Sequence, residues 1–229
     1  MNSRQLLAPV VGLILAGAAA RAQGVLSYAT QFPAAGLAAT DWSQTLELPG
    51  FDSRLGTLTR VMLDYSGEVF QGVVAENTAG TATPYGLSST SSLEVYNAKG
   101  TCLFDPGPIE LNRTGTLAPF DGTLDFAGAS GVSFAQDTRT TDSLNDPNLG
   151  AYIDAGMLQF LATATNVTTL SSGGDSVSGA SSQAAVRLGI TYAYTPIPEP
   201  TAYAAVVGLA ALGWVVLRRR ARAGATAGP

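Results

Sequence analysis

The chain has 229 residues, 46% of them hydrophobic and only 13% charged, and one hydrophobic core is enough for this length. Between Gln23 and Thr195, six basic side chains stand against sixteen acidic ones, a net charge of −10, which excludes a typical nucleic-acid-binding domain. The sequence has no histidine and only one cysteine, so histidine-based catalytic triads, histidine-ligated zinc and an intrachain disulfide are excluded.

Residues 1–22 have the pattern of a secretory signal peptide. A basic side chain near the start is followed by the apolar run Leu6–Ala20, and the small residues Ala20 and Ala22 occupy the positions that signal peptidase reads. We therefore expect signal peptidase to cleave before Gln23 and the rest of the chain to be exported. The alternative is an uncleaved N-terminal anchor, for which the apolar run is short.

Residues 23–195 are expected to form one extracytoplasmic domain made of β-strands. The alternation is clearest near its end, where the five apolar residues at every second position from Val186 to Tyr194 fall on one face. Similar runs are separated by clusters of turn residues and lie at Val25–Gln31, Trp42–Leu48, Leu58–Tyr65, Glu68–Ala75, Ser91–Asn97, Gly131–Ala135 and Met157–Thr168.

Roughly eight to ten short strands with polar turns favour an all-β fold, an antiparallel β-sandwich of jelly-roll or immunoglobulin-like topology. A signal helix and a C-terminal transmembrane helix are expected to flank it. The segment Ser171–Ser182 is rich in serine and glycine and predicts a mobile hairpin loop. Cys102 is followed by Leu103 and Phe104, which favours a buried thiol that behaves as a small hydrophobe.

Five segments of the middle region resemble the choice-of-anchor E domain: Thr40–Leu46, Leu48–Asp52, Leu55–Leu58, Glu76–Thr78 and Ile190–Pro196. The resemblance implies a β-rich extracellular domain of the kind that is joined to differing C-terminal anchors. That family has no established activity, so the resemblance implies no catalytic residue.

Packing alone also explains the first of these segments. Trp42, Leu46 and Leu48 are spaced so that they can fill one core face, and Pro49 with the following glycine turns the chain. Gly56 then permits the chain to enter the next strand through a tight turn.

The sequence contains neither the G-x-S-x-G motif of serine hydrolases nor the G-x-x-x-x-G-K-[ST] motif of phosphate-binding loops. It also contains no C-x-x-C pair and no H-E-x-x-H zinc-binding motif. We therefore expect no catalytic residue, no metal site and no cofactor. Paired carboxylates leave a glycoside hydrolase as the one catalytic alternative. Asp137, Asp142, Asp146 and Asp154 lie in an expected polar loop region that could ligate Ca²⁺, although their spacing matches no EF-hand.

The C-terminal segment, residues 196–229, has three parts in order. The Pro-Glu-Pro motif at 198–200 precedes the apolar segment 201–217, which would be about 26 Å long as a helix and just able to span a bilayer. Tyr203 and Trp214 suit the two membrane interfaces, and the arginines after the helix place the C-terminus in the cytoplasm. The motif consists of Pro198, Glu199 and Pro200, and the arginine cluster in 218–222 consists of Arg218, Arg219, Arg220 and Arg222.

These three parts resemble the PEP-CTERM sorting signal of exported proteins in Gram-negative bacteria. The resemblance implies that a membrane-embedded exosortase processes the chain near residues 198–200 and passes it from the inner membrane to the cell surface or extracellular matrix. Its partners would then be that enzyme, signal peptidase and the membrane. The alternative is an ordinary single-pass anchor.

The sequence therefore predicts a noncatalytic surface or matrix protein, with association with exopolysaccharide in a biofilm as a further expectation. A carbohydrate-binding or adhesive module is the first alternative, and a carboxylate-based hydrolase is the second. A binding module would present a row of exposed aromatic side chains. The candidates for such a row are Trp42, Tyr65, Tyr85, Tyr96 and Tyr152.

Overall fold

The computed structural model describes residues 23–154, 156–197 and 207–218. Within them the chain is almost entirely β-structure, with two short 3₁₀ turns, η1 (Ser53–Leu55) and η2 (Leu149–Tyr152), and a helix at 207–218. The strands form two antiparallel sheets, as the sequence predicts. Sheet A contains β1 (Gly24–Phe32), β2 (Ala38–Ala39), β4 (Gly56–Asn77), β8 (Gly131–Asp146) and β10 (Ser176–Pro196).

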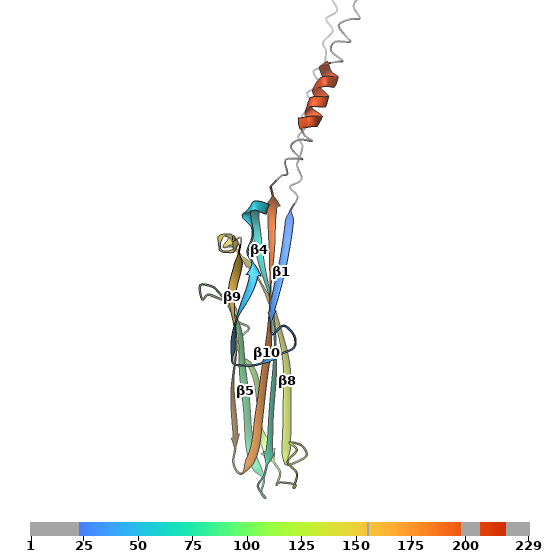
Figure 1. Cartoon of the computed structure of the whole chain (residues 1–229). Helices are drawn as coiled ribbons and strands as arrows, with labels where there is room; N and C mark the ends of the chain where they lie inside the picture. The colour runs from blue at the N-terminus through green and yellow to red at the C-terminus, as the bar shows by residue number, and fades with distance from the viewer. Residues whose placement is uncertain (1–22, 155, 198–206, 219–229) are drawn as a thin grey trace, which may run out of the picture.

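Sheet B packs against sheet A through a shared core (Figure 1). Its strands are β3 (Trp42–Pro49), β5 (Thr83–Asn97), β6 (Cys102–Phe104), β7 (Ile109–Leu117) and β9 (Met157–Ser172). The pairing of the long strands is nested along the chain: β1 pairs with β10, β3 with β9, β4 with β8 and β5 with β7. Strands that are far apart in the sequence are therefore neighbours in each sheet.

The two sheets form a long, narrow body (Figure 1). Strand β4 has 22 residues, which at the usual rise corresponds to about 70 Å. At one end Gly24 pairs with Tyr194 and Gly56 pairs with Pro196, so both chain ends leave the sandwich there. We call this the proximal end. At the opposite, distal end Asn77 of β4 pairs with Ser176 of β10, and turns join β4 to β5 and β9 to β10.

The interior contains two apolar clusters with a polar layer between them. The larger cluster fills the proximal and central part, and the smaller one, around Val73 and Leu87, lies toward the distal end. Between them the fully buried amide nitrogen of Gln71 donates to the carbonyl oxygen of Ser89 and to Ser91 Oγ, both at 3.0 Å. Asn166 Nδ2 donates to the hydroxyl oxygens of Ser89 and Ser91, both at 2.9 Å. The layer joins β4, β5 and β9 across the two sheets.

Each of the predicted strand runs lies within a strand. The predicted facing of β10 is confirmed, because Val186, Leu188, Ile190 and Tyr192 are buried in the larger cluster. However, two of the predicted runs, Leu58–Tyr65 and Glu68–Ala75, are parts of the single strand β4. The short strands β2 and β6 and the longer β7 are additional to the predicted runs.

Two local predictions are wrong. Ser171–Ser182 is mostly strand, and only the turn between Ser172 and Ser176 connects β9 in sheet B with β10 in sheet A. It is therefore no hairpin loop within one sheet. Cys102 is exposed, because β6 is a short strand at the edge of sheet B and the next inward side chain is Phe104.

The helix at 207–218 overlaps the predicted transmembrane segment 201–217 and ends one residue beyond it. Nowhere in the described residues is there a helix with both the length and the apolar character needed to cross a bilayer. Residues 201–206 lie outside the described part, and the transmembrane helix stays a prediction. The signal peptide at 1–22 also lies outside the described residues.

Candidate functional site

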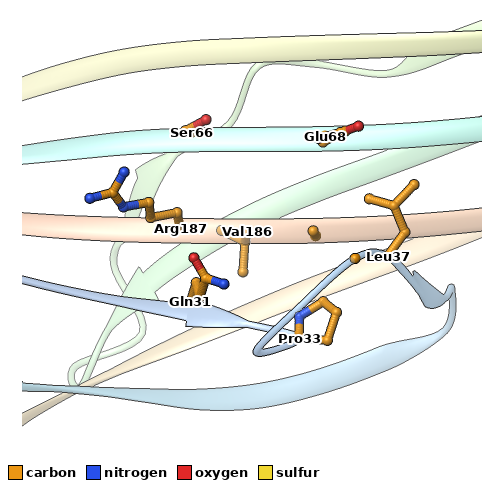
Figure 2. Close-up of a pocket in the computed structure, with 9 residues that line it drawn as sticks. Gln31, Pro33, Leu37, Ser66, Glu68, Val186 and Arg187 are labelled. Carbon is orange, nitrogen blue, oxygen red and sulfur yellow. The ribbon is translucent and has the colours of Figure 1, made fainter.

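A shallow groove on the outer face of sheet A is the candidate functional site. It consists of two adjoining hollows of about 260 and 400 Å³ that share Ser66 and Arg187. We call it the sheet A groove, and its polar lining includes Ser27, Gln31, Asp64, Ser66, Glu68, Arg187 and Thr191. Figure 2 shows the first hollow, with side chains from β4, β10 and β1 lying side by side.

Strand alternation places these polar side chains outward. In the register of β4 and β10, Ser66 lies opposite Arg187 and Asp64 lies opposite Gly189. A Cβ at Gly189 would be 3.6 Å from the Cβ of Asp64, an ordinary contact. The glycine is therefore not required by packing, and it keeps the floor of the groove open beside Asp64.

The wall of the first hollow forms where β1 leaves sheet A. Strand β1 ends at Phe32, and the next residue, Pro33, has no N–H to continue the ladder. Gln31 Nε2 donates to the carbonyl oxygen of Ala34 at 2.6 Å, which ties down the loop before β2 pairs with β10 again. Pro33 and Leu37 consequently stand beside the polar strands (Figure 2).

The charges in the groove differ in how they are paired. Glu68 accepts a hydrogen bond from Arg139 at 2.9 Å, and this hydrogen bond is the main cause of the raised pKa of Arg139. Of the two ion pairs in the described residues, neither includes Arg187 or Asp64. A guanidinium and a carboxylate are therefore available to a ligand in the second hollow.

The groove is suited to hydrogen bonding along an extended polar ligand. Its lining includes small residues such as Ala29 and Gly189 together with hydroxyl, amide and charged side chains. The hydroxyls of Thr191 and Ser27 share a hydrogen bond of 3.0 Å. Such a surface offers donors and acceptors, which orient a ligand by hydrogen bonding. The lining contains no histidine or cysteine that could act as nucleophile or base.

The predicted sorting and cleavage residues are mostly outside the described part. This applies to the motif Pro198, Glu199 and Pro200, to Ala20 and Ala22 of the signal peptidase site, and to Arg219, Arg220 and Arg222. Gln23 is described and immediately precedes β1, and Arg218 is the last residue of the helix at 207–218. The structure therefore leaves the sorting motif and the cleavage site as predictions.

The four aspartates of the expected polar loop do not come together. Asp137, Asp142 and Asp146 lie on strand β8, and Asp154 follows η2 and accepts the N–H of Gly156. Residues 137 and 142 are an odd number apart, so a strand places them on opposite faces. The expected loop is wrong for Asp137, Asp142 and Asp146, whereas Asp154 lies in a loop. The described residues contain no group of three or more acidic, histidine or cysteine side chains that could hold a metal ion.

The aromatic candidates do not form an exposed row. Tyr65 and Tyr152 are buried, and the Tyr152 hydroxyl donates to Asp146 at 2.6 Å. Trp42 packs on Phe32 with ring centroids 4.9 Å apart, as the packing interpretation predicts. The sheet A groove could not be predicted from the sequence, because its residues come from segments more than a hundred positions apart.

No family model matches the chain, and no curated protein matches it. Among solved structures it has similarity to dimeric latent PorU from Porphyromonas gingivalis, at 8% identity and a TM-score of 0.30 over 76% of this chain. The match spans only 13% of the PorU chain.

Viral proteins give similar matches. The VP2 subviral particle of infectious bursal disease virus matches 77% of this chain and 37% of its own, at 14% identity and a TM-score of 0.25. Desmodium yellow mottle tymovirus matches 87% of this chain and 99% of its own, at 10% identity and a TM-score of 0.20. At TM-scores this low, these similarities establish no function for the chain.

Proposed function

We propose that the chain is an exported, noncatalytic protein of the bacterial cell surface or extracellular matrix, sorted by an exosortase-like enzyme that acts near residues 198–200. The observation that carries the proposal is the position of the chain ends. Gly24 and Pro196 both lie at the proximal end, so the expected signal peptide and the expected sorting segment attach to the same end of the sandwich.

An elongated body held at one end is suited to display. The distal turns lie about 70 Å from the proximal end, counted along the 22 residues of β4. A protein processed at residues 198–200 would therefore keep its long faces accessible while its proximal end is near the membrane. The negative charge of the domain favours solubility after release.

The strand order supports jelly-roll connectivity over the immunoglobulin-like alternative. In an eight-stranded jelly roll the chain folds back on itself so that first and last strands pair, and the inner pairs follow. The nested pairs of β1 with β10, β3 with β9, β4 with β8 and β5 with β7 match this scheme. This connectivity places the chain ends together, as the proposal requires.

The surroundings of the carboxylates favour a noncatalytic role over a hydrolase. Asp105 and Asp142 line one cavity, and both are exposed. The general acid of a glycoside hydrolase needs a surrounding that keeps it protonated, as an apolar pocket does. In addition, each carboxylate already accepts a backbone N–H in its own segment, at 2.8 Å from Gly107 and 2.7 Å from Ser143.

The experiment that tests the proposal is Glu199→Ala in the full-length chain, expressed in a Gram-negative host with an exosortase system. We expect the wild type to lose its C-terminal tail and to reach the surface or medium. The variant should remain at full length in the inner membrane, because the apolar segment and the arginines that direct insertion are unchanged. Fractionation with detection of the tail and of residues 23–195 measures both outcomes.

Glu47→Ala is the matched control, because Glu47 is an exposed glutamate on β3 and is not part of the Pro-Glu-Pro motif. It should be processed like the wild type. Surface-delivered wild-type protein that still carries residues 218–222 would contradict the proposal and leave a plain single-pass membrane protein.

A second candidate function is binding of a neutral polysaccharide in the sheet A groove. The specific observation in its favour is that Arg187 and Asp64 line the second hollow without an ion-pair partner among the described residues. Planar charged groups can each exchange two hydrogen bonds with vicinal hydroxyls. A neutral chain is favoured because the net charge of the domain repels anionic ones.

Native electrophoresis of the full-length protein in gels containing dextran or hydroxyethylcellulose tests this function. We expect one of these polymers to retard the wild type, and Arg187→Ala to weaken the affinity about tenfold. Lys99→Ala is the control, because it removes one exposed positive charge from the turn between β5 and β6. Equal retardation of the two variants would exclude the groove as the binding site.

A further inference from the structure

Strand β8 forms one edge of sheet A over most of the length of the body (Figure 1). Its 16 residues contain no proline, and they pair with β4 without a register shift. On its other side β8 pairs with no strand in the part of the chain that the structure describes, and none of the further backbone hydrogen bonds found there involves it. Long open edges of this kind pair readily with a strand of another chain.

The other edge strands are shorter than β8. Strands β1, β3 and β7 have nine, eight and nine residues. In addition, Pro33 directly follows β1, and Pro49 ends β3. Shortness and proline are common ways in which proteins protect an edge, and β8 has neither.

The odd-numbered residues of β8 direct their backbone groups away from β4. The N–H of Ser143 donates to the carboxylate of Asp142 at 2.7 Å, so it points to the open side of the strand. Because these groups alternate along an antiparallel strand, the same holds for Asp137 and Arg139. Both side chains lie on the outer face of sheet A, since Arg139 lies opposite Glu68 of the sheet A groove.

The charges on this edge are complementary to themselves. Asp137 and Arg139 flank Thr138 on one face of β8. If two copies of β8 pair antiparallel about a two-fold axis at Thr138, Asp137 of each copy lies directly opposite Arg139 of the other. An axis at residue 137 would place two aspartates opposite each other, and an axis at 139 would place two arginines so. Because like charges directly opposite destabilise a strand pair, charge selects the axis at Thr138.

The same axis gives the inward-facing Asp142 a partner. Asp142 lies opposite the buried Tyr65, and an inward charge on an edge strand usually hinders pairing. With the axis at Thr138, Asp142 lies opposite Phe134 of the second copy. Within each chain the guanidinium carbon of Arg113 lies 5.4 Å from the centre of the Phe134 ring. The carboxylate would therefore approach an arginine, which an unrelated strand would not supply.

The remaining contacts of this register are also favourable. Val132 lies opposite Leu144 of the second copy, and both are half-buried side chains at the margins of the two apolar clusters. Thr138 lies opposite its own copy, and paired threonines stabilise antiparallel strands. Arg139 bonds Glu68 through one nitrogen, yet its side chain remains 69% exposed and can be reached. All residues of β8 except the last have a partner, over about 50 Å.

We propose that two copies of this chain associate edge to edge through β8, as an antiparallel strand pair centred on Thr138, so that the two A sheets become one continuous sheet. Backbone hydrogen bonds supply the affinity, and the opposite-charge pairs select a second copy over another strand. The contact uses the same surface on both copies and therefore closes at a dimer. It involves no residue of 1–22 or 196–229, so the inference does not rest on the proposed sorting.

An exchange of charges tests the proposed register. Asp137→Arg and Arg139→Asp each place like charges opposite each other in their own dimer, whereas a mixture of the two variants restores both opposite-charge pairs. Sedimentation velocity of the purified full-length chain in a mild detergent, at about 0.15 M salt, measures association. We expect the wild type to dimerise, each variant alone to associate about tenfold more weakly or less, and the equimolar mixture to regain dimers.

A disulfide locates the axis independently of the charges. In a Cys102→Ser background, which removes the exposed native thiol, Thr138→Cys places two thiols opposite each other. Their Cα atoms would be about 4.5 Å apart, within the range of a disulfide. Thr141→Cys is the matched control, because its counterpart in the second copy would be about 20 Å away along the strand. We expect mild oxidation to cross-link Thr138→Cys and to leave Thr141→Cys as single chains.

Three results would overturn the proposal. One is a wild type that remains monomeric at about 100 μM, since an association weaker than this would be too weak to count as a dimer. Another is association that both charge variants leave unchanged, as contact through the apolar segment 201–217 or another face would give. The third is equal cross-linking of Thr138→Cys and Thr141→Cys, which would show that the chains meet without a fixed register.

Discussion

Replacing Ile190 by aspartate is expected to lower the free energy of unfolding by about 4 kcal/mol or more. Ile190 is fully buried at the centre of sheet A, on a strand with neighbours on both sides. Tyr28 on β1 and Leu63 on β4 lie opposite it in register. Neither neighbour carries a positive charge, so the new carboxylate would be buried without an ion-pair partner.

Thr191→Asp is the matched control one position along the same strand. Thr191 faces the sheet A groove and is half-buried, and the substitution removes a single hydroxyl contact with Ser27. It should cost less than about 1 kcal/mol. Thermal melts followed by circular dichroism compare the two variants, and equal melting temperatures would show that the facing of β10 is misassigned.

The facing of β10 could be predicted because it is a local property of the sequence. A strand with one buried face needs apolar residues at every second position, and β10 has them from Val186 to Tyr194. The same holds for Leu46 and Leu48 on β3, which are buried as predicted. Where alternation was strong, the sequence was sufficient to assign the strand and its inward face.

The length of β4 could not be predicted, because Ser66 and Gly67 resemble a turn. In the structure Gly67 stays within the strand, where a Cβ would overlap the hydroxyl of Tyr65 on the same strand and lie 2.6 Å from Leu93 Cδ2 on the facing sheet. The glycine therefore makes room for the Tyr65 ring and for the close approach of the two sheets. The second part of that reason lies in a partner 26 positions away, which no local pattern reveals.

The serine-rich start of β10 was misinterpreted for a related reason. Serine and glycine usually indicate a mobile loop when no apolar alternation accompanies them. Here Ser182 Oγ hydrogen-bonds Ser91 Oγ at 3.2 Å, next to the buried amide of Gln71. The interior at this level is a polar layer, so an inward, half-buried position of β10 is filled by serine. Periodicity of hydrophobic residues cannot detect such a strand.

The candidate site could not be predicted from local sequence patterns, for the same physical reason. The sheet A groove joins Gln31 of β1, Ser66 of β4 and Arg187 of β10. Only the nested pairing of strands brings these residues together. A sequence shows which residues carry charge, but their proximity depends on the connectivity of the sheets.

Gly56→Ala is expected to destabilise the proximal end by about 3 kcal/mol. Gly56 has a φ of +153°, a conformation that residues with a Cβ rarely adopt. A Cβ there would overlap the carbonyl oxygen of Thr195 and lie 2.9 Å from Pro196 Cα, and both are backbone atoms that no rotamer change can move. The end of β10 would have to separate from β4.

The control is Gly80→Ala in the distal turn, where no atom lies within 4 Å of the added Cβ. Its melting temperature should differ little from that of the wild type, whereas Gly56→Ala should melt about 10 °C lower. Hydrogen exchange locates the effect: the amide of Ile197, which donates to the Leu55 carbonyl oxygen at 3.2 Å, should lose protection first. Because the same pairing holds the chain ends together, unchanged protection in Gly56→Ala would show that β4 and β10 do not meet there.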